Sequence, residues 1–255
     1  MAMVLGIANQ KGGVGKTATA VNTSTYLAAL GKKVLLVDLD PQANATSGLG
    51  VDPRKVDFSV YHAINNKIAT AQAIRNTELF GYHLLPSSFD LAGASVELVN
   101  MKNREFRLND ALTKVRHEYD YIVIDSPPSL GLLTINGLVA SDEILIPVQC
   151  EYYALEGLAQ LLETVDVVKN NLGKDINILG AVLTMYDKRN KLDRSIAKEV
   201  RRNFPGYVFD AVIPRNVDLA EAPGHGKTIF QFNPSSQGAL AYKQLAEEVI
   251  KRCEA

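Results

Sequence analysis

The sequence predicts an α/β fold in which helices flank both faces of a mostly parallel, twisted sheet. Short runs of β-branched and leucine-rich residues alternate with longer segments of helical pattern, which is typical of βαβ units. Most short runs are apolar throughout, as strands are when both of their faces are covered. The chain has 255 residues, of which 47% are hydrophobic and 22% charged. Because we find no linker or repeat, we expect one domain over residues 1–255.

Seven short apolar runs are expected to be strands. They are Val4–Ala8, Val34–Asp38, Tyr82–Leu85, Tyr121–Asp125, Glu143–Val148, Ile176–Thr184 and Val208–Ile213. Six segments with helical spacing of apolar residues are expected to be helices. They are Lys16–Leu30, Val96–Arg116, Leu132–Val139, Leu155–Asn171, Leu192–Asn203 and Ser236–Cys253. Residues 41–80 show the least regular pattern.

Composition excludes some classes of function. The formal net charge is −1, so any DNA binding has to come from a local basic patch. No apolar run approaches the roughly 20 residues that cross a bilayer, and the start at Met1–Gly6 lacks the basic region of a signal peptide. Cys150 and Cys253 match no metal or redox spacing. We therefore expect a reduced, cytoplasmic setting.

The segment between the first strand and the first helix indicates a phosphate-binding loop. It reads Lys-Gly-Gly-Val-Gly-Lys-Thr over Lys11–Thr17. Its second half fits the pattern G-x-x-x-x-G-K-[ST], but Gln10 replaces the first glycine. The glycines allow backbone N–H groups to surround phosphate, Lys16 would reach the β- and γ-phosphates, and the Thr17 hydroxyl would hold Mg²⁺. Lys11 is then available for a nucleotide held by another copy of the chain. The alternative is a glycine-rich turn with surface lysines.

Acidic residues follow two of the expected strands. Asp38 and Asp40 end the strand at Val34–Asp38, and Asp125 ends Tyr121–Asp125. The carboxyl ends of parallel strands collect ligands, so these carboxylates are expected near the loop. Asp125 is placed as a Walker B residue that approaches Mg²⁺. The alternative is a set of solvated carboxylates at strand ends.

These segments together resemble the deviant Walker A ATPases of the ParA/MinD group, and most closely the ParA/Soj proteins, with a fold of P-loop NTPase type. The resemblance extends from Met3 to about Tyr242. It is carried by the segments 11–17, 38–44, 125–131, 184–187, 213–216 and 219–223.

The resemblance implies an ATP-dependent homodimer that uses Mg²⁺. Lys11 would cross to the partner's ATP, and Gly12 would lie where the two loops approach. Asp40 would position the attacking water, Asp38 would support either Mg²⁺ or the loop, and Thr17 and Asp125 would serve the metal. The residues expected to bind ATP are Lys11, Gly12, Gly13, Val14, Gly15, Lys16, Thr17, Ala18, Pro214, Arg215 and Asn216. Many relatives have threonine in place of Ala18, so we expect a weaker contact there.

The resemblance also implies non-specific binding of double-stranded DNA by basic residues late in the chain. Arg189 matches one family position, whereas Asp218 stands where some relatives have arginine. The alternative is an ordinary solvated helix face. The expected DNA-binding residues are Arg189, Lys198, Arg201, Arg202 and Lys227.

The expected partner is a ParB-type centromere-binding protein that stimulates hydrolysis, with the chain associated with the nucleoid. The chain begins directly at the first strand, with no helix-turn-helix before it, which favours the chromosomal type. The main alternative is a MinD-like membrane-cycling ATPase, although the segment Leu245–Ala255 has three glutamates and no aromatic residue. A reductase like the nitrogenase iron protein would need a pair of interface cysteines, and Cys150 and Cys253 do not have that spacing. A biosynthetic ligase or amidase on the same fold stays open.

Overall fold

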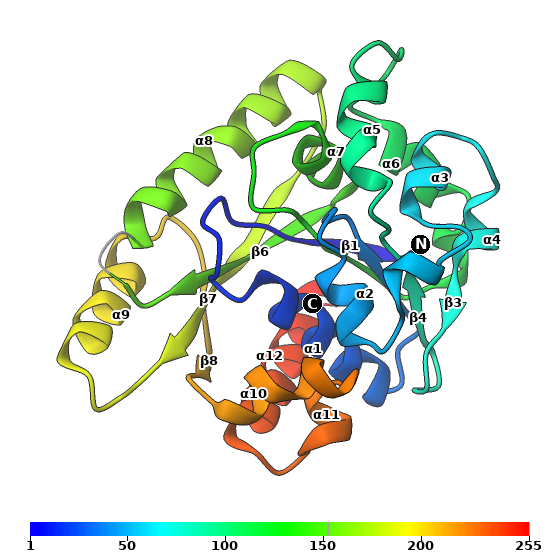
Figure 1. The fold of residues 1–255 in the computed structure, drawn as a ribbon. Helices are drawn as coiled ribbons and strands as arrows, with labels where there is room; N and C mark the ends of the chain where they lie inside the picture. The colour runs from blue at the N-terminus through cyan, green and yellow to red at the C-terminus, as the bar shows by residue number, and fades with distance from the viewer. Residues whose placement is uncertain (152–153, 255) are drawn as a thin grey trace.

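The computed structural model describes residues 1–151 and 154–254, in which eight strands form one twisted sheet (Figure 1). The spatial order is β3-β4-β2-β5-β1-β6-β7-β8. Every neighbouring pair is parallel except β3 and β4, which are antiparallel. The strands are β1 (Met3–Ile7), β2 (Val34–Asp38), β3 (Arg75–Asn76), β4 (Tyr82–Leu85), β5 (Tyr121–Asp125), β6 (Glu143–Gln149), β7 (Asn177–Tyr186) and β8 (Val208–Pro214). The expected mostly parallel sheet is confirmed.

Helices cover both faces of this sheet, as expected (Figure 1). The longer helices are α1 (Lys16–Ala29), α5 (Leu91–Leu98), α6 (Arg107–Thr113), α7 (Leu132–Ala140), α8 (Ala154–Leu172), α9 (Lys191–Asn203) and α12 (Gln237–Cys253). The shorter α-helices are α2 (Asn44–Gly48), α3 (Val60–Ile64), α4 (Thr70–Ala73), α10 (Val217–Glu221) and α11 (Ile229–Phe232). The 3₁₀ turns are η1 (Pro53–Lys55), η2 (Arg116–Glu118) and η3 (Ala222–His225).

The strands bury alternate residues on opposite faces of the sheet. On β1, Leu5 and Ile7 pack into a cluster with α1, α11 and α12, whereas Val4 packs toward α3, α5, α6 and α7. A third cluster joins the β6–β7 half of the sheet to α7, α8 and α9. Because both faces are covered by apolar helix surfaces, the strands are apolar throughout rather than alternating.

One expected helix is wrong: Val96–Arg116 is not continuous. α5 ends at Leu98 and α6 begins at Arg107. Asn103 between them has a left-handed φ of 53°, which Asn tolerates better than most residues. The buried Asn136 of α7 fixes the break, because its amide donates to the Arg104 carbonyl (2.8 Å) and its Oδ1 accepts from Leu108 N (3.0 Å). A contact from a distant helix therefore overrides the local helical pattern.

The strand order explains why the carboxylates meet. β5 lies between β1 and β2, so Asp125 pairs in register with Ile7 on one side and with Asp38 on the other. The loop after β1 therefore opens beside both acidic strand ends. This is the switch point at which ligands collect in open parallel sheets.

Candidate nucleotide-binding site

The loop before α1 is shaped by its glycines. Gly13 and Gly15 have φ values of 76° and 87°, a left-handed conformation that favours glycine. α1 then begins at Lys16 with no side-chain cap and no acidic residue in its first turn. The N–H groups of that turn therefore carry the positive end of the helix dipole toward the loop. This arrangement suits an anion.

The loop is anchored to the neighbouring strands. The Asn9 amide donates to the Pro147 carbonyl (2.7 Å), and its Oδ1 accepts from Lys11 N (3.0 Å). On the other side, the Thr184 hydroxyl donates to the Val14 carbonyl (2.8 Å). No sequence pattern pointed to Asn9, and Thr184 was expected only as part of the family resemblance. These contacts hold the loop between β6 and β7.

Lys16 turns back into its own loop. Its ammonium is buried and donates to the Lys11 carbonyl (3.1 Å). Burial lowers the pKa of Lys16, and the carboxylates of Asp125 and Asp40 oppose that shift. The lysine thus lies where a phosphate would meet it.

Asp125 is buried, and neither of its side-chain oxygens has a hydrogen-bond partner among the described residues. Burial raises the pKa of this carboxyl, as does the adjacent Asp38, while the nearby Thr17 hydroxyl and the Lys16 ammonium oppose the shift. Buried polar atoms are rarely left unpaired. Carboxylate and hydroxyl oxygens are ligands that Mg²⁺ prefers, so Asp125 and Thr17 fit a magnesium ion.

Unlike those of Asp125, the carboxylate oxygens of Asp38 both accept hydrogen bonds. Its Oδ2 accepts from the Thr46 N–H (2.8 Å) and hydroxyl (2.6 Å), and its Oδ1 accepts from Asp40 N (3.2 Å). Burial raises the pKa of Asp38 to about 6, although the hydrogen bonds from Thr46 and Asp40 oppose the shift. Of the two roles expected for Asp38, these bonds favour support of the loop over direct metal binding.

Two hollows adjoin the loop. The first, of ≈ 420 Å³, is lined by loop residues together with Lys16, Thr17, Asp40 and Gln42. The second, of ≈ 190 Å³, lies between Gly15 and Ala18 on one side and the expected ATP-binding segment Pro214–Asn216 on the other. The structure therefore brings Pro214, Arg215 and Asn216 to the loop, as expected. Met185, with a left-handed φ of 53°, lines both hollows, a role that sequence analysis missed.

We call the first hollow, which Lys16, Thr17 and Asp40 line, the phosphate hollow, and Lys11 does not line it. Its ammonium instead pairs with Glu151 at 2.6 Å, and about a third of the Lys11 side chain is exposed. Glu151 follows β6, 140 residues away in sequence. No sequence pattern marked this glutamate.

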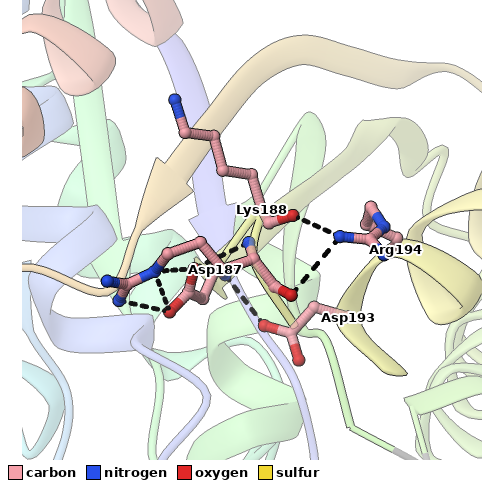
Figure 2. Close-up of polar contacts among 5 residues, drawn as sticks. Asp187, Lys188, Asp193 and Arg194 are labelled. Carbon is pink, nitrogen blue, oxygen red and sulfur yellow. Dashed lines mark hydrogen bonds and ion pairs between the residues drawn. The ribbon is translucent and has the colours of Figure 1, made fainter. Parts of the chain in front are cut away.

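The turn between β7 and α9 carries part of the expected DNA surface. Figure 2 shows Lys188 pointing away from its neighbours, while Arg194 donates to the Lys188 carbonyl (2.7 Å) and Asp193 accepts from Asp187 N (2.8 Å). Arg189 is highly exposed, but its guanidinium forks onto Asp187 (2.8 Å). The hydrogen bonds within the turn thus fix its shape.

The other expected DNA residues are divided between two places. On α9, Lys198 and Arg202 are exposed, whereas Arg201 donates to the Phe209 carbonyl (3.0 Å) and so also ties α9 to β8. Lys227 lies apart from them, in a third hollow of ≈ 450 Å³ that it shares with Thr17. The structure therefore does not bring Lys227 onto the α9 surface.

Comparisons with known proteins agree with this geometry. A family model described as an AAA domain matches residues 2–178. The chain is 52% identical to the sporulation initiation inhibitor protein Soj of Bacillus subtilis (strain 168), over 98% of each chain. It is 49% identical to the chromosome partitioning protein ParA of Myxococcus xanthus (strain DK1622), over 98% of this chain and 88% of that one. Cobyrinic acid a,c-diamide synthase from Mycobacterium smegmatis, solved with bound ADP and magnesium, has a TM-score of 0.88 and 37% identity, covering 100% of this chain and 96% of that one.

The unpaired Asp125 predicts a pH effect on stability in the absence of nucleotide. Its folded pKa is raised, so the folded protein binds more protons than the unfolded chain above pH ~4. The free energy of unfolding should therefore fall as the pH rises above about 4. Asp125→Asn should flatten this dependence and raise the free energy of unfolding at pH 8 by about 1–3 kcal/mol. Urea denaturation at several pH values measures both effects.

The matched control is Asp57→Asn, because Asp57 is exposed. An Asp125→Asn variant that is less stable than the parent at pH 8 would contradict the assignment of Asp125 as an unpaired, destabilising carboxylate.

Proposed function

The chain belongs to the ParA/Soj family of chromosome-partitioning ATPases, and from this premise we propose that it is a switch built on an ATP-dependent homodimer. The dimer binds double-stranded DNA without sequence preference. A ParB-type partner stimulates hydrolysis of ATP, and this hydrolysis releases the protein from DNA. The observation that carries the proposal is that the two lysines of the loop point to different places. Lys16 lines its own phosphate hollow, whereas Lys11 is directed out of it toward Glu151.

Nucleotide binding rests on the loop, the free N-terminus of α1 and the orphaned carboxylate of Asp125. The backbone N–H groups and Lys16 would hold the phosphates, and Thr17 and Asp125 would hold Mg²⁺. The metal, when bound, neutralises charge on the phosphates. Pro214, Arg215 and Asn216 would contact the base in the smaller hollow. Apart from its own chain neighbours, Gly12 has no atom of the described residues within 4 Å of where a Cβ would stand, so the space beside it would accept a second loop.

Asp40 is the candidate for orienting the attacking water. It lines the phosphate hollow, and its Oδ1 already accepts from Gln42 N (2.9 Å). Oδ2 enters no hydrogen bond among the described residues and is left for a water molecule. A fixed carboxylate can take or orient a proton at that position.

DNA binding rests on the exposed cations of the β7–α9 turn and of α9. Each subunit offers few such residues, and affinity for DNA falls steeply when fewer phosphates are neutralised. A dimer doubles the contacts, so pairing around ATP switches binding on. Part of this charge is already engaged, because Asp187 holds Arg189.

The rival functions predict different stimulants of ATP hydrolysis. A MinD-like role would need a membrane-binding helix, but α12 buries Tyr242, Leu245 and Val249 in the core. In the described part of the chain, no helix has the length and apolar character to span a membrane. A biosynthetic synthase is supported by the similarity of the fold to the synthase structure from Mycobacterium smegmatis. Stimulation by DNA with a ParB-type protein supports partitioning, anionic lipid supports the membrane role, and a small carboxylic acid with an amine donor supports a synthase.

Asp40→Ala tests the switch directly. The variant should bind ATP and dimerise, remain on DNA, and hydrolyse ATP at least about 10²-fold more slowly, because the group that orients the water is gone. Light scattering and DNA-binding assays with Mg²⁺-ATP measure these properties. Lys16→Ala is the control that should stay monomeric with ATP. DNA affinity of Asp40→Ala as low as that of the nucleotide-free protein would refute the assigned role.

Glu151→Gln tests whether Lys11 has to leave its ion pair in order to cross the interface. A half-exposed pair of this kind contributes about 0.2–1 kcal/mol, so its removal should strengthen ATP-dependent dimerisation by about 1.4-fold to fivefold per subunit. Sedimentation with Mg²⁺-ATP measures the change, and Glu163→Gln, an exposed change on α8, is the control. A weaker dimer would mean that Glu151 contributes to the interface instead.

Arg189→Glu and Lys198→Glu should weaken DNA binding and reduce the salt dependence of the affinity by about one unit of slope per lost phosphate contact. Dimerisation should not change. Arg54→Glu is a matched control, because Arg54 is exposed and forks onto Asp52 as Arg189 does onto Asp187. Equal loss of DNA binding and dimerisation would place these residues at the subunit interface.

A further inference from the structure

The backbone of Asp40 is fixed by side chains from two other segments. Its N–H donates to Asp38 Oδ1 at 3.2 Å, at the end of β2. Its carbonyl accepts from the Ser87 hydroxyl at 2.7 Å, and Ser87 follows β4. The same carbonyl accepts from Ala43 N at 2.9 Å. Both backbone polar groups of Asp40 are therefore paired, so its carboxylate is attached to a fixed backbone.

Thr46 of α2 closes these contacts into a ring. Its hydroxyl donates to Asp38 Oδ2 (2.6 Å) and accepts from Ser87 N (2.9 Å). The ring thus runs from Asp38 to Asp40, to Ser87, to Thr46 and back to Asp38. It joins the ends of two neighbouring strands to the short helix between them in sequence.

Each side chain that forms the ring is fully buried. Asp38, Thr46 and Ser87 are each 0% exposed. Hydrogen bonds in such an environment strengthen one another, and losing one leaves its partner unpaired at a cost. A buried, closed ring of this kind restricts Asp40 to one position.

We propose that Ser87 and Thr46 are positioning residues for ATP hydrolysis, which act by holding Asp40 where it orients the attacking water. The proposal rests on the role of Asp40 in the proposed function. Neither residue lines the phosphate hollow. Ser87 bonds the Asp40 carbonyl directly, and Thr46 reaches Asp40 through its bonds to Ser87 and Asp38. Reacting groups need placement within a fraction of an ångström, and an error of 1 Å can cost ~10²-fold in rate.

The adjacent Ser88 provides a matched control. It is nearly as buried as Ser87, but its hydroxyl contacts Ser59 at 3.0 Å and not Asp40. If buried serines after β4 served only to stabilise the fold, Ser87→Ala and Ser88→Ala would have similar effects.

The decisive experiment compares Ser87→Ala with Ser88→Ala. Ser87→Ala should lower the kcat for ATP hydrolysis by about tenfold or more, while ATP affinity and ATP-dependent dimerisation change by less than about twofold. Ser88→Ala should leave all three near the parent values. An unchanged kcat in Ser87→Ala, or ATP affinity that falls as far as kcat does, would overturn the proposal.

A double variant separates positioning from stability. In the Asp40→Ala background, adding Ser87→Ala should change the residual hydrolysis by less than about twofold, because Ser87 acts only through Asp40. Additive losses would overturn the proposal. Normal hydrolysis by Asp40→Ala alone would instead overturn the role of Asp40 in the proposed function, so the two failures are distinguishable.

Thr46 gives a second test that does not depend on Ser87→Ala folding. Thr46→Ser keeps the hydroxyl that bridges Asp38 and Ser87, whereas Thr46→Val keeps the shape and removes the hydroxyl. We expect Thr46→Ser to retain kcat and Thr46→Val to lose it about tenfold with ATP affinity preserved. Equal kcat in the two variants would overturn the positioning role of Thr46.

Discussion

The rest of the site depends on one buried carboxylate. Asp125 ends β5 between the ends of β1 and β2, is fully buried, and has no hydrogen-bond partner for either oxygen in the described part of the chain. A carboxylate in that state destabilises the fold unless positive charge approaches it. Lys16 and the unclaimed N-terminus of α1 lie on the approach. The site is thus built around a carboxylate whose charge a metal-bound nucleotide would compensate.

The two lysines of the loop are coupled through a single carbonyl. Lys16 donates to the backbone carbonyl of Lys11, whose side chain pairs with Glu151. If a phosphate draws the Lys16 ammonium away, the Lys11 carbonyl loses its donor and the segment that holds Lys11 can move. Phosphate binding at Lys16 would thereby be linked to the Lys11 side chain at the edge of the site. This linkage is the physical basis for treating the loop as a switch.

The sheet and the loop could be predicted because local sequence determines them. Apolar strands covered on both faces are visible as apolar runs, and the carboxylates at their ends follow from parallel pairing. The break at Asn103, the ring around Asp40 and the Lys11–Glu151 pair could not be predicted, because each depends on a partner distant in sequence. Asn136 is about thirty residues from Arg104, Ser87 is 47 from Asp40, and Glu151 is 140 from Lys11. Lys227 is another case, because the presence of basic residues in a sequence does not say which of them lie on the same surface.

The site is rigid in one part and loosely held in another. The Asp40 backbone is held by the buried side chains of Asp38 and Ser87, so its carboxylate is in place before any partner arrives. The Lys11 ammonium is held by a half-exposed ion pair, which is easily exchanged for another anion. In the proposed dimer, the second subunit would therefore bring positive charge to the nucleotide, whereas Asp40 would already be in position to orient the water. Under the proposed function, a chain built in this way would hydrolyse ATP when it is paired and stay inactive when it is alone, which suits a timer better than a fast enzyme.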